Sequence, residues 1–312
     1  MKTLTETTPV TSRALQQYVM LAVFYVALIM LLPANSVTMH EYNLSALEYK
    51  IVLLALAIPS LLVWLAAFIG YAKLRLYARS LSKTPEGIYF DELAGGCTWL
   101  AWSLPISTIV PTILNAVANQ YPGLHETAII ISNYTGLILP LIGFSVIASA
   151  SRGLLGNVNA KLSLANARVI IIAFLLFGVL YCFLTFSRFD LTSLGSNDNP
   201  YFLPAWLMVI TIIVPYLYAW FMGILAAYEL TLFRKHVSGV LYRNALGLLV
   251  GGLLAVILSS VALQYVNSVD PRVGHLVLSY KIVLVLLFRI IGGGGFILLA
   301  VGASRLQKIE EV

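Results

Sequence analysis

Long apolar runs alternate with short polar loops along the whole of this 312-residue chain. A bilayer core needs about 20 mostly apolar residues per helix. Runs of that length are placed at 16–36, 50–72, 93–117, 126–150, 167–187, 203–229, 244–266 and 276–303. Strands of a β-barrel would be shorter and would alternate in polarity, which these runs do not. The pattern therefore predicts an all-α integral membrane protein with eight transmembrane helices.

Composition supports the same class of protein. Hydrophobic residues make up 60% of the chain and charged residues only 10%, where soluble proteins carry about 25% charged residues. The mean hydropathy is +0.91. The loops between the apolar runs are too short for a soluble domain, and no Walker-type glycine loop for ATP is present. Any activity is expected within the bilayer or at its two surfaces.

The basic residues are distributed unevenly between alternate loops. With the N-terminus inside, the outer side holds only Lys50, Arg188, Arg272 and Lys281. The inner side holds Lys2, Arg13, Lys73, Arg75, Arg79, Lys83, Arg152, Lys161, Arg168, Arg234, Lys235, Arg243, Arg305 and Lys308. Such an excess on one side follows the positive-inside rule. It predicts a multi-pass protein of the cell membrane with both termini in the cytoplasm, and it accounts for the net charge of +6 without nucleic acid as a partner.

An internal repeat is visible when the sequence is compared with itself at an offset of 156 residues. Pro59 then falls on Pro215 and Trp64 on Trp220, and the match continues through three consecutive helices. We interpret residues 1–156 and 157–312 as two four-helix transmembrane repeats. An even number of helices per unit makes the repeat parallel, with a pseudo-twofold axis along the membrane normal. Two unrelated halves of similar composition are the alternative.

Arg289 is the first candidate for an intramembrane site, because it lies within an apolar run. A charge at the bilayer centre costs about 2.5–3.5 kcal/mol, so such residues usually face protein or water. Its side chain should reach toward the outer half of its helix, where Lys281 adds a second positive charge. The expected partners are the amide of Asn133, carbonyls freed by helix prolines, or carboxylates of the outer loops (Glu41, Glu48 and Glu126). An anion-attracting vestibule and a purely structural arginine both stay open.

Four consecutive glycines follow Arg289, and Gly292 and Gly293 lie on its face of the helix. Glycine costs up to about 1 kcal/mol relative to alanine within a helix. Either these glycines let a neighbouring helix approach closely, or they mark an unwound segment that exposes backbone groups to a ligand.

Two further groups of polar residues carry weaker hypotheses. Lys73 and Glu229 fall at matching positions of the repeat, as a pair across the axis or as separate interfacial charges. His40, His125 and His275 all lie on the outer side, but their spacing has no metal signature. We therefore expect neither a metal nor a cofactor.

Three classes of function stay open. The duplication, the helix prolines and Arg289 favour a transporter or channel for a small, anionic solute. The lack of a deep intramembrane carboxylate favours a structural, assembly or anchoring subunit of a membrane complex, or a homo-oligomer. A membrane-embedded enzyme is the third class, although neither a nucleophile–base pair nor a metal cluster is visible. The expected partners are the lipid bilayer and a small ligand.

Overall fold

Seven long helices account for the described part of this computed structural model, which is residues 8–32, 45–121, 124–158, 214–267 and 274–310. They are α1 (Thr8–Leu31), α3 (Ala46–Ser80), α4 (Pro85–Gln120), α5 (His125–Asn157), α8 (Val214–His236), α9 (Val240–Asn267) and α10 (Gly274–Glu310). No strand occurs in these residues. All seven helices are long and apolar enough to cross a membrane. The chain is a polytopic, α-helical membrane protein.

These helices correspond to seven of the eight runs expected from the sequence. The expected helix at 167–187 and residues 203–213 of the next one lie outside the described residues. Pro105 and Pro111 interrupt the third run, yet α4 continues through both of them. A chain at membrane depth has no water to satisfy a broken backbone, which favours keeping the helix intact around a proline.

Local sequence explains where several helices begin. Ser45 and Glu48 form a capping box at the start of α3, in which the Ser45 amide donates to Glu48 Oε2 at 2.8 Å. Thr84 caps α4, and Pro85 occupies its first turn. The turn between α3 and α4 is tight, because a Cβ added to Gly87 would lie 2.0 Å from the Leu81 carbonyl oxygen. Only glycine fits at this position.

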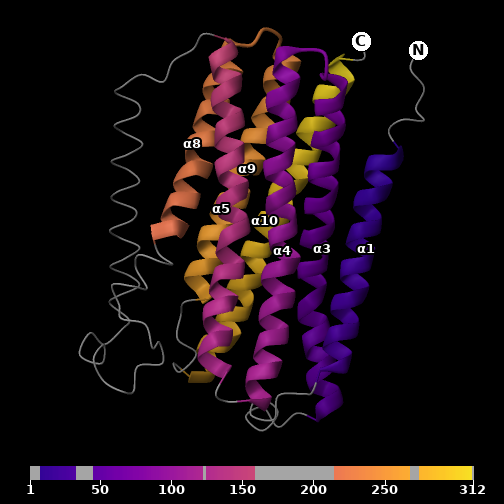
Figure 1. Cartoon of the computed structure of the whole chain (residues 1–312), viewed down its shortest axis with the longest axis vertical. Helices are drawn as coiled ribbons and strands as arrows, with labels where there is room; N and C mark the ends of the chain where they lie inside the picture. Colours follow the sequence, from indigo (N-terminus) through magenta and orange to yellow (C-terminus); the bar gives the residue numbers. More distant parts are fainter. Residues whose placement is uncertain (1–7, 33–44, 122–123, 159–213, 268–273, 311–312) are drawn as a thin grey trace.

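The helices after α1 pack as a closed ring (Figure 1). In chain order, α3 packs on α4, α4 on α5, α5 on α8, α8 on α9 and α9 on α10, and α10 returns to pack on α3. Helix α1 lies outside this ring, against α3. We call the end of the bundle with the α3–α4 turn and the C-terminus of α10 the inner end. The opposite end, where α3 and α10 begin, is the outer end.

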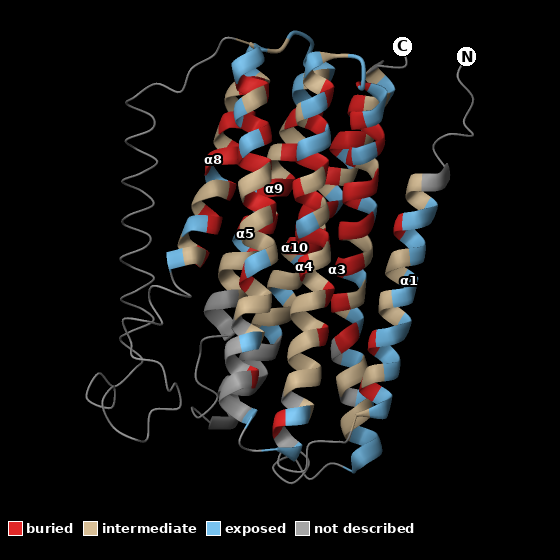
Figure 2. Ribbon diagram, in the orientation of Figure 1, coloured by how far each residue is buried: buried red, intermediate tan, exposed pale blue. Residues whose placement is uncertain are grey.

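Burial is uneven along the bundle. One apolar core receives buried side chains from all seven described helices. Figure 2 shows that the buried residues gather in the inner half of the bundle, whereas the described side chains in the outer halves of α4, α5 and α10 are mostly half-buried or exposed. The helix faces that point away from the bundle carry large apolar side chains, such as Val23 and Met30 of α1 and Ile290 of α10. A bilayer provides acyl chains to cover such surfaces, which water would not tolerate over so large an area.

Candidate intramembrane site

Arg289 lies near the middle of α10 and contacts α3. Its Nη1 donates a hydrogen bond to the Oγ atom of Ser60. Ser60 is only 3% exposed, and Arg289 is half-buried. The arginine therefore has a neutral hydroxyl as its partner, from a helix of the other half of the chain.

Two more hydroxyl groups belong to the same neighbourhood. Tyr25 of α1 lies close to Thr112 of α4, and it is near enough to interact electrostatically with Arg289. The Thr112 hydroxyl donates to the Thr108 carbonyl at 2.7 Å. We refer to Arg289, Ser60, Tyr25 and Thr112 as the outer polar cluster. It gathers one cation and three hydroxyls from four helices.

Apolar packing holds this cluster in place. Tyr25 and Trp64 lie with their ring centroids 5.2 Å apart, in a small core that also contains Ala57, Ile29 and Ile109. This core joins α1, α3 and α4 beside Ser60. The side chains that could rearrange around the guanidinium are thus fixed from one side by aromatic and aliphatic contacts.

The partner of Arg289 differs from the partners expected from the sequence. Ser60 was not among them. Glu48 is exposed at the start of α3, where it bonds to Ser45. Glu41 lies outside the described residues, as do the side chains of Glu126 and Asn133. A contact of Asn133 with Arg289 stays a prediction, although α5 packs on α4 and α8 whereas α10 packs on α3 and α9.

Ser60 had a detectable signal in the sequence. Between Ile51 and Gly70 it is the single residue with a hydroxyl or a charge, and it follows Pro59. A lone polar residue in an apolar helix calls for a partner at the same depth on a neighbouring helix. The missing information was which helix lies beside α3, because nothing in a single sequence pairs residues 60 and 289.

The glycines after Arg289 pack against helices on two sides. A Cβ at Gly292 would lie 2.5 Å from Ser259 Oγ, and a Cβ at Gly293 would lie 3.2 Å from a methyl group of Val63. The Ser259 hydroxyl donates to the Phe288 carbonyl at 2.7 Å. Helix α10 runs without a break from Gly274 to Glu310. In this structure Gly292 and Gly293 therefore allow α10 to pack closely between α9 and α3. This packing sets the position of Arg289 along the length of the bundle.

Lys281 lies on the same helix, eight residues before Arg289, but its side chain lies outside the described residues. The structure therefore places it on the outer side of Arg289 without assigning it a contact. Its role as a second positive charge stays a prediction.

Glu229 forms an ion pair at the inner end of the bundle. Its Oε1 atom lies 3.2 Å from Nε of Arg152, which joins α8 to α5. The Glu229 side chain is 3% exposed and that of Arg152 is 65% exposed. The second carboxylate oxygen of Glu229 is buried and has no hydrogen-bond partner among the described residues. Glu229 therefore pairs with Arg152 and not with Lys73. It is also buried, whereas the sequence suggested a charge at the interface with water.

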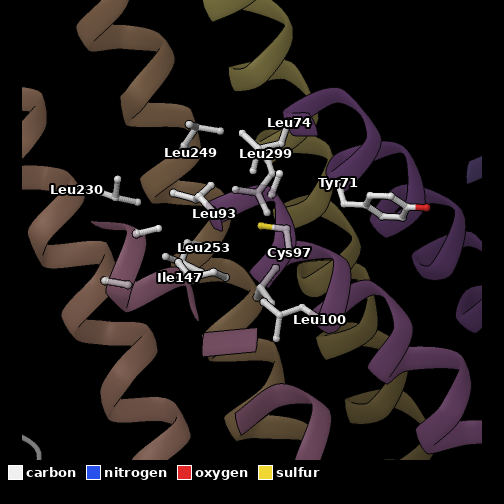
Figure 3. Close-up of a cluster of buried hydrophobic side chains, with 14 of the residues drawn as sticks. Tyr71, Leu74, Leu93, Cys97, Leu100, Ile147, Leu230, Leu249, Leu253 and Leu299 are labelled. Atoms are coloured by element: carbon white, nitrogen blue, oxygen red, sulfur yellow. The ribbon is translucent and has the colours of Figure 1, made fainter. Parts of the chain in front are cut away.

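Whether the three outer histidines bind a metal ion stays a question outside the described residues. The described part of the chain holds no group of three histidine, cysteine or acidic residues placed to bind a metal ion. However, His40 lies outside it, and so do the side chains of His125 and His275. Cys97 is a free thiol buried on α4. Figure 3 shows it among leucine and isoleucine side chains that come from α3, α4, α5, α8, α9 and α10.

No protein-family model, curated protein or solved structure matches this chain.

Proposed function

We propose that this polytopic membrane protein carries a small anionic solute across the bilayer, and that the outer polar cluster binds it. The observation that carries the proposal is the set of partners around Arg289. They are the hydroxyls of Ser60 and, at longer range, Tyr25. Among the described residues, Arg152 and Glu229 form an ion pair, whereas Arg289 has no carboxylate as a partner.

A guanidinium without a counter-charge is costly at membrane depth. An anion entering from water would supply that charge, and the planar fork of arginine suits carboxylate and phosphate groups in particular. Ser60, Tyr25 and Thr112 add hydroxyl groups around it. The lower burial of the outer half supports approach from the outer end, whereas the inner half is filled by the apolar core.

Flux of simple anions through the purified protein tests this function. The protein is reconstituted into liposomes, and efflux of chloride, acetate and inorganic phosphate is measured against protein-free liposomes. We expect at least one of these anions to leave faster from the protein-containing liposomes. Equal rates for all three, with protein shown to be folded and inserted, would contradict anion transport.

A structural or assembly subunit is the second candidate, and the filled inner half favours it. A scaffold has no need for a path between its helices, and the core at the inner end is continuous across both halves. Gentle purification separates the two functions. A scaffold should co-purify with stoichiometric partner subunits, and it should show no anion flux.

We also propose that the chain contains eight transmembrane helices in two repeats, residues 1–156 and 157–312. The order of helices around the ring supports this. At the offset of 156, α3 corresponds to α8 and α4 to α9, and α10 then corresponds to α5. A half-turn exchanges every contact of the ring with another one: α3·α4 with α8·α9, α4·α5 with α9·α10, and α10·α3 with α5·α8.

Matching glycine pairs support the repeat at the level of single contacts. A Cβ at Gly96 would lie 2.8 Å from the Gly143 carbonyl oxygen, and one at Gly252 would lie 2.6 Å from the Gly295 carbonyl oxygen. Gly96 corresponds to Gly252, and both Gly143 and Gly295 precede a phenylalanine. Trp64 and Trp220 are also alike in burial, at 2% and 1% exposed.

The repeat predicts where residues 167–187 pack. Tyr71 of α3 donates a hydrogen bond to Gln17 of α1 at 2.8 Å. The corresponding positions of the second repeat are Ala173 and Ala227. In a chain without its native cysteines, we expect a short bifunctional thiol reagent to cross-link Ala173→Cys to Ala227→Cys. The control pairs Ala173→Cys with Ala66→Cys on α3 and should not react. Absence of the first cross-link would remove the eighth helix from its proposed place.

The charge distribution predicts the orientation of the bundle. Among the described residues, Arg79 in the last turn of α3, Lys83 between α3 and α4, and Lys308 of α10 belong to the inner end. We therefore propose that the inner end is cytoplasmic. In intact cells, Gly195→Cys should react with an impermeant thiol reagent and Ala160→Cys should not. Labelling of residue 160 from outside the cell would contradict the proposed orientation.

A further inference from the structure

Polar bonds between the two proposed halves occur at two different depths. At the inner end, Arg152 of α5 pairs with Glu229 of α8, and Tyr77 of α3 bonds to Tyr242 of α9 with 3.0 Å between the hydroxyl oxygens. Toward the outer end, Arg289 of α10 bonds to Ser60 of α3. Ser60 and Tyr77 lie on the same helix about 25 Å apart, from the rise of 1.5 Å per residue. All three bonds cross from one half to the other.

Within each half, two helices meet through close backbone contacts. Helices α4 and α5 meet at Gly96 and Gly143, and α9 and α10 meet at Gly252 and Gly295, with backbone atoms in close approach. Such glycine contacts have little room to slide, because packed backbones resist deformation. Helices α3 and α10 also meet closely across the halves, where a Cβ at Gly70 would lie 3.0 Å from the Phe296 carbonyl oxygen. Each half is therefore expected to move as a unit, with α10·α3 as the fixed side and relative motion at α5·α8.

The Arg152–Glu229 pair is poorly suited to a purely stabilising role. Its carboxylate is almost completely buried and keeps one oxygen without a partner among the described residues, while Arg152 is mostly exposed. A buried ion pair of this kind contributes little net stability, because desolvation offsets the attraction. Its best-attested use is to specify one arrangement over another.

From these observations we infer that the inner bonds, Arg152–Glu229 and Tyr77–Tyr242, form a gate that holds the halves together at the inner end. Opening it separates α5 from α8 and gives water access from the inner side to the core around Cys97. The Arg289–Ser60 bond joins the halves nearer the outer end, so the two sets of bonds act at opposite sides of the buried core. This inference deepens the proposed transport function and rests on it for its purpose.

Cys97 provides a native reporter of such opening. It is 2% exposed and is surrounded by residues of both halves, including Ile147 of α5 and Leu299 of α10 (Figure 3). Cys182 is replaced by alanine to leave one thiol. Inside-out vesicles are then treated with a small, water-soluble methanethiosulfonate reagent, and the rate of Cys97 modification is measured by mass spectrometry.

We expect Glu229→Gln and Arg152→Gln to raise that rate about tenfold, since each removes one charge of the ion pair and leaves the other charge uncompensated or the bond weakened. Arg152→Lys keeps the charge and should label nearly as slowly as the parent chain. Tyr77→Phe removes the second inner bond and should have a smaller effect in the same direction. The matched control is Tyr71→Phe, which breaks a hydrogen bond of similar geometry to Gln17 within one half and should leave the rate unchanged.

Each result bears on the gate. Unchanged labelling in Arg152→Gln, whose side chain is mostly exposed and whose loss the fold should tolerate, would overturn it. Equal acceleration by Tyr71→Phe would also overturn it, because general loosening would then explain the effect. No substrate is needed, so a protein that passes this test without moving anions keeps the gate and loses the proposed transport function. A protein that moves anions but fails the labelling test keeps the proposed transport function and loses only the gate.

Discussion

Replacing Gly252 with alanine is expected to lower the free energy of unfolding by roughly 1–3 kcal/mol, the usual cost of adding a group to a packed core. The new Cβ would lie 2.6 Å from the Gly295 carbonyl oxygen and 2.9 Å from Leu299. The carbonyl belongs to the backbone of α10 and cannot rotate away, so α9 and α10 must separate. The measurement is thermal unfolding of the purified protein in detergent, where we expect the midpoint to fall by about 5 °C.

The adjacent glycine is the control. Nothing lies within 4 Å of a Cβ added to Gly251, so Gly251→Ala should be neutral or slightly stabilising, because alanine favours a helix over glycine. The proposed repeat requires the same contrast in the first half. Gly96→Ala should destabilise, with Gly143 as the close neighbour, and Gly95→Ala should not. A harmless Gly252→Ala would mean that the two helices are farther apart than described.

Membrane helices were the part of the fold most readily predicted from the sequence. Apolar runs of sufficient length have few alternatives to a helix in lipid, because every backbone group must be satisfied internally. Their ends were less predictable. Helices α3 and α10 have 35 and 37 residues, well beyond the runs of 50–72 and 276–303, since polar flanks continue a helix at no cost in water.

Contacts between distant helices were not predictable in the same way. The burial of Glu229 depends on Arg152, which lies 77 residues earlier, and on how closely α5 approaches α8. Hydropathy reports the average depth of a helix and not which neighbour covers a given face. For the same reason Ser60 was missed as the partner of Arg289, while Arg289 itself was found from its charge alone.

Arg289 variants distinguish a binding residue from a structural one, and their effects on anion flux should be the largest in the protein. Arg289→Met removes the charge but keeps a long flexible side chain, so it should leave the fold intact and abolish flux. Replacing buried ions with apolar residues is often neutral or stabilising, and Ser60 would lose only one hydrogen bond. The thermal midpoint should therefore stay unchanged or rise.

Arg289→Lys is the sharper variant, because it keeps the positive charge. The ammonium group is a compact point charge, whereas guanidinium offers a planar set of donors that can bond to Ser60 and to an anion at once. We expect anion flux to fall by about tenfold or more, in line with the loss of one charge-assisted hydrogen bond of ~1.5–3 kcal/mol. Ser60→Ala is the matched control from α3: it removes the partner that orients the guanidinium and should lower flux less than Arg289→Lys does. If flux is unchanged in Arg289→Lys and in Arg289→Met, the guanidinium serves only the packing of α10 on α3, and the scaffold function is favoured instead.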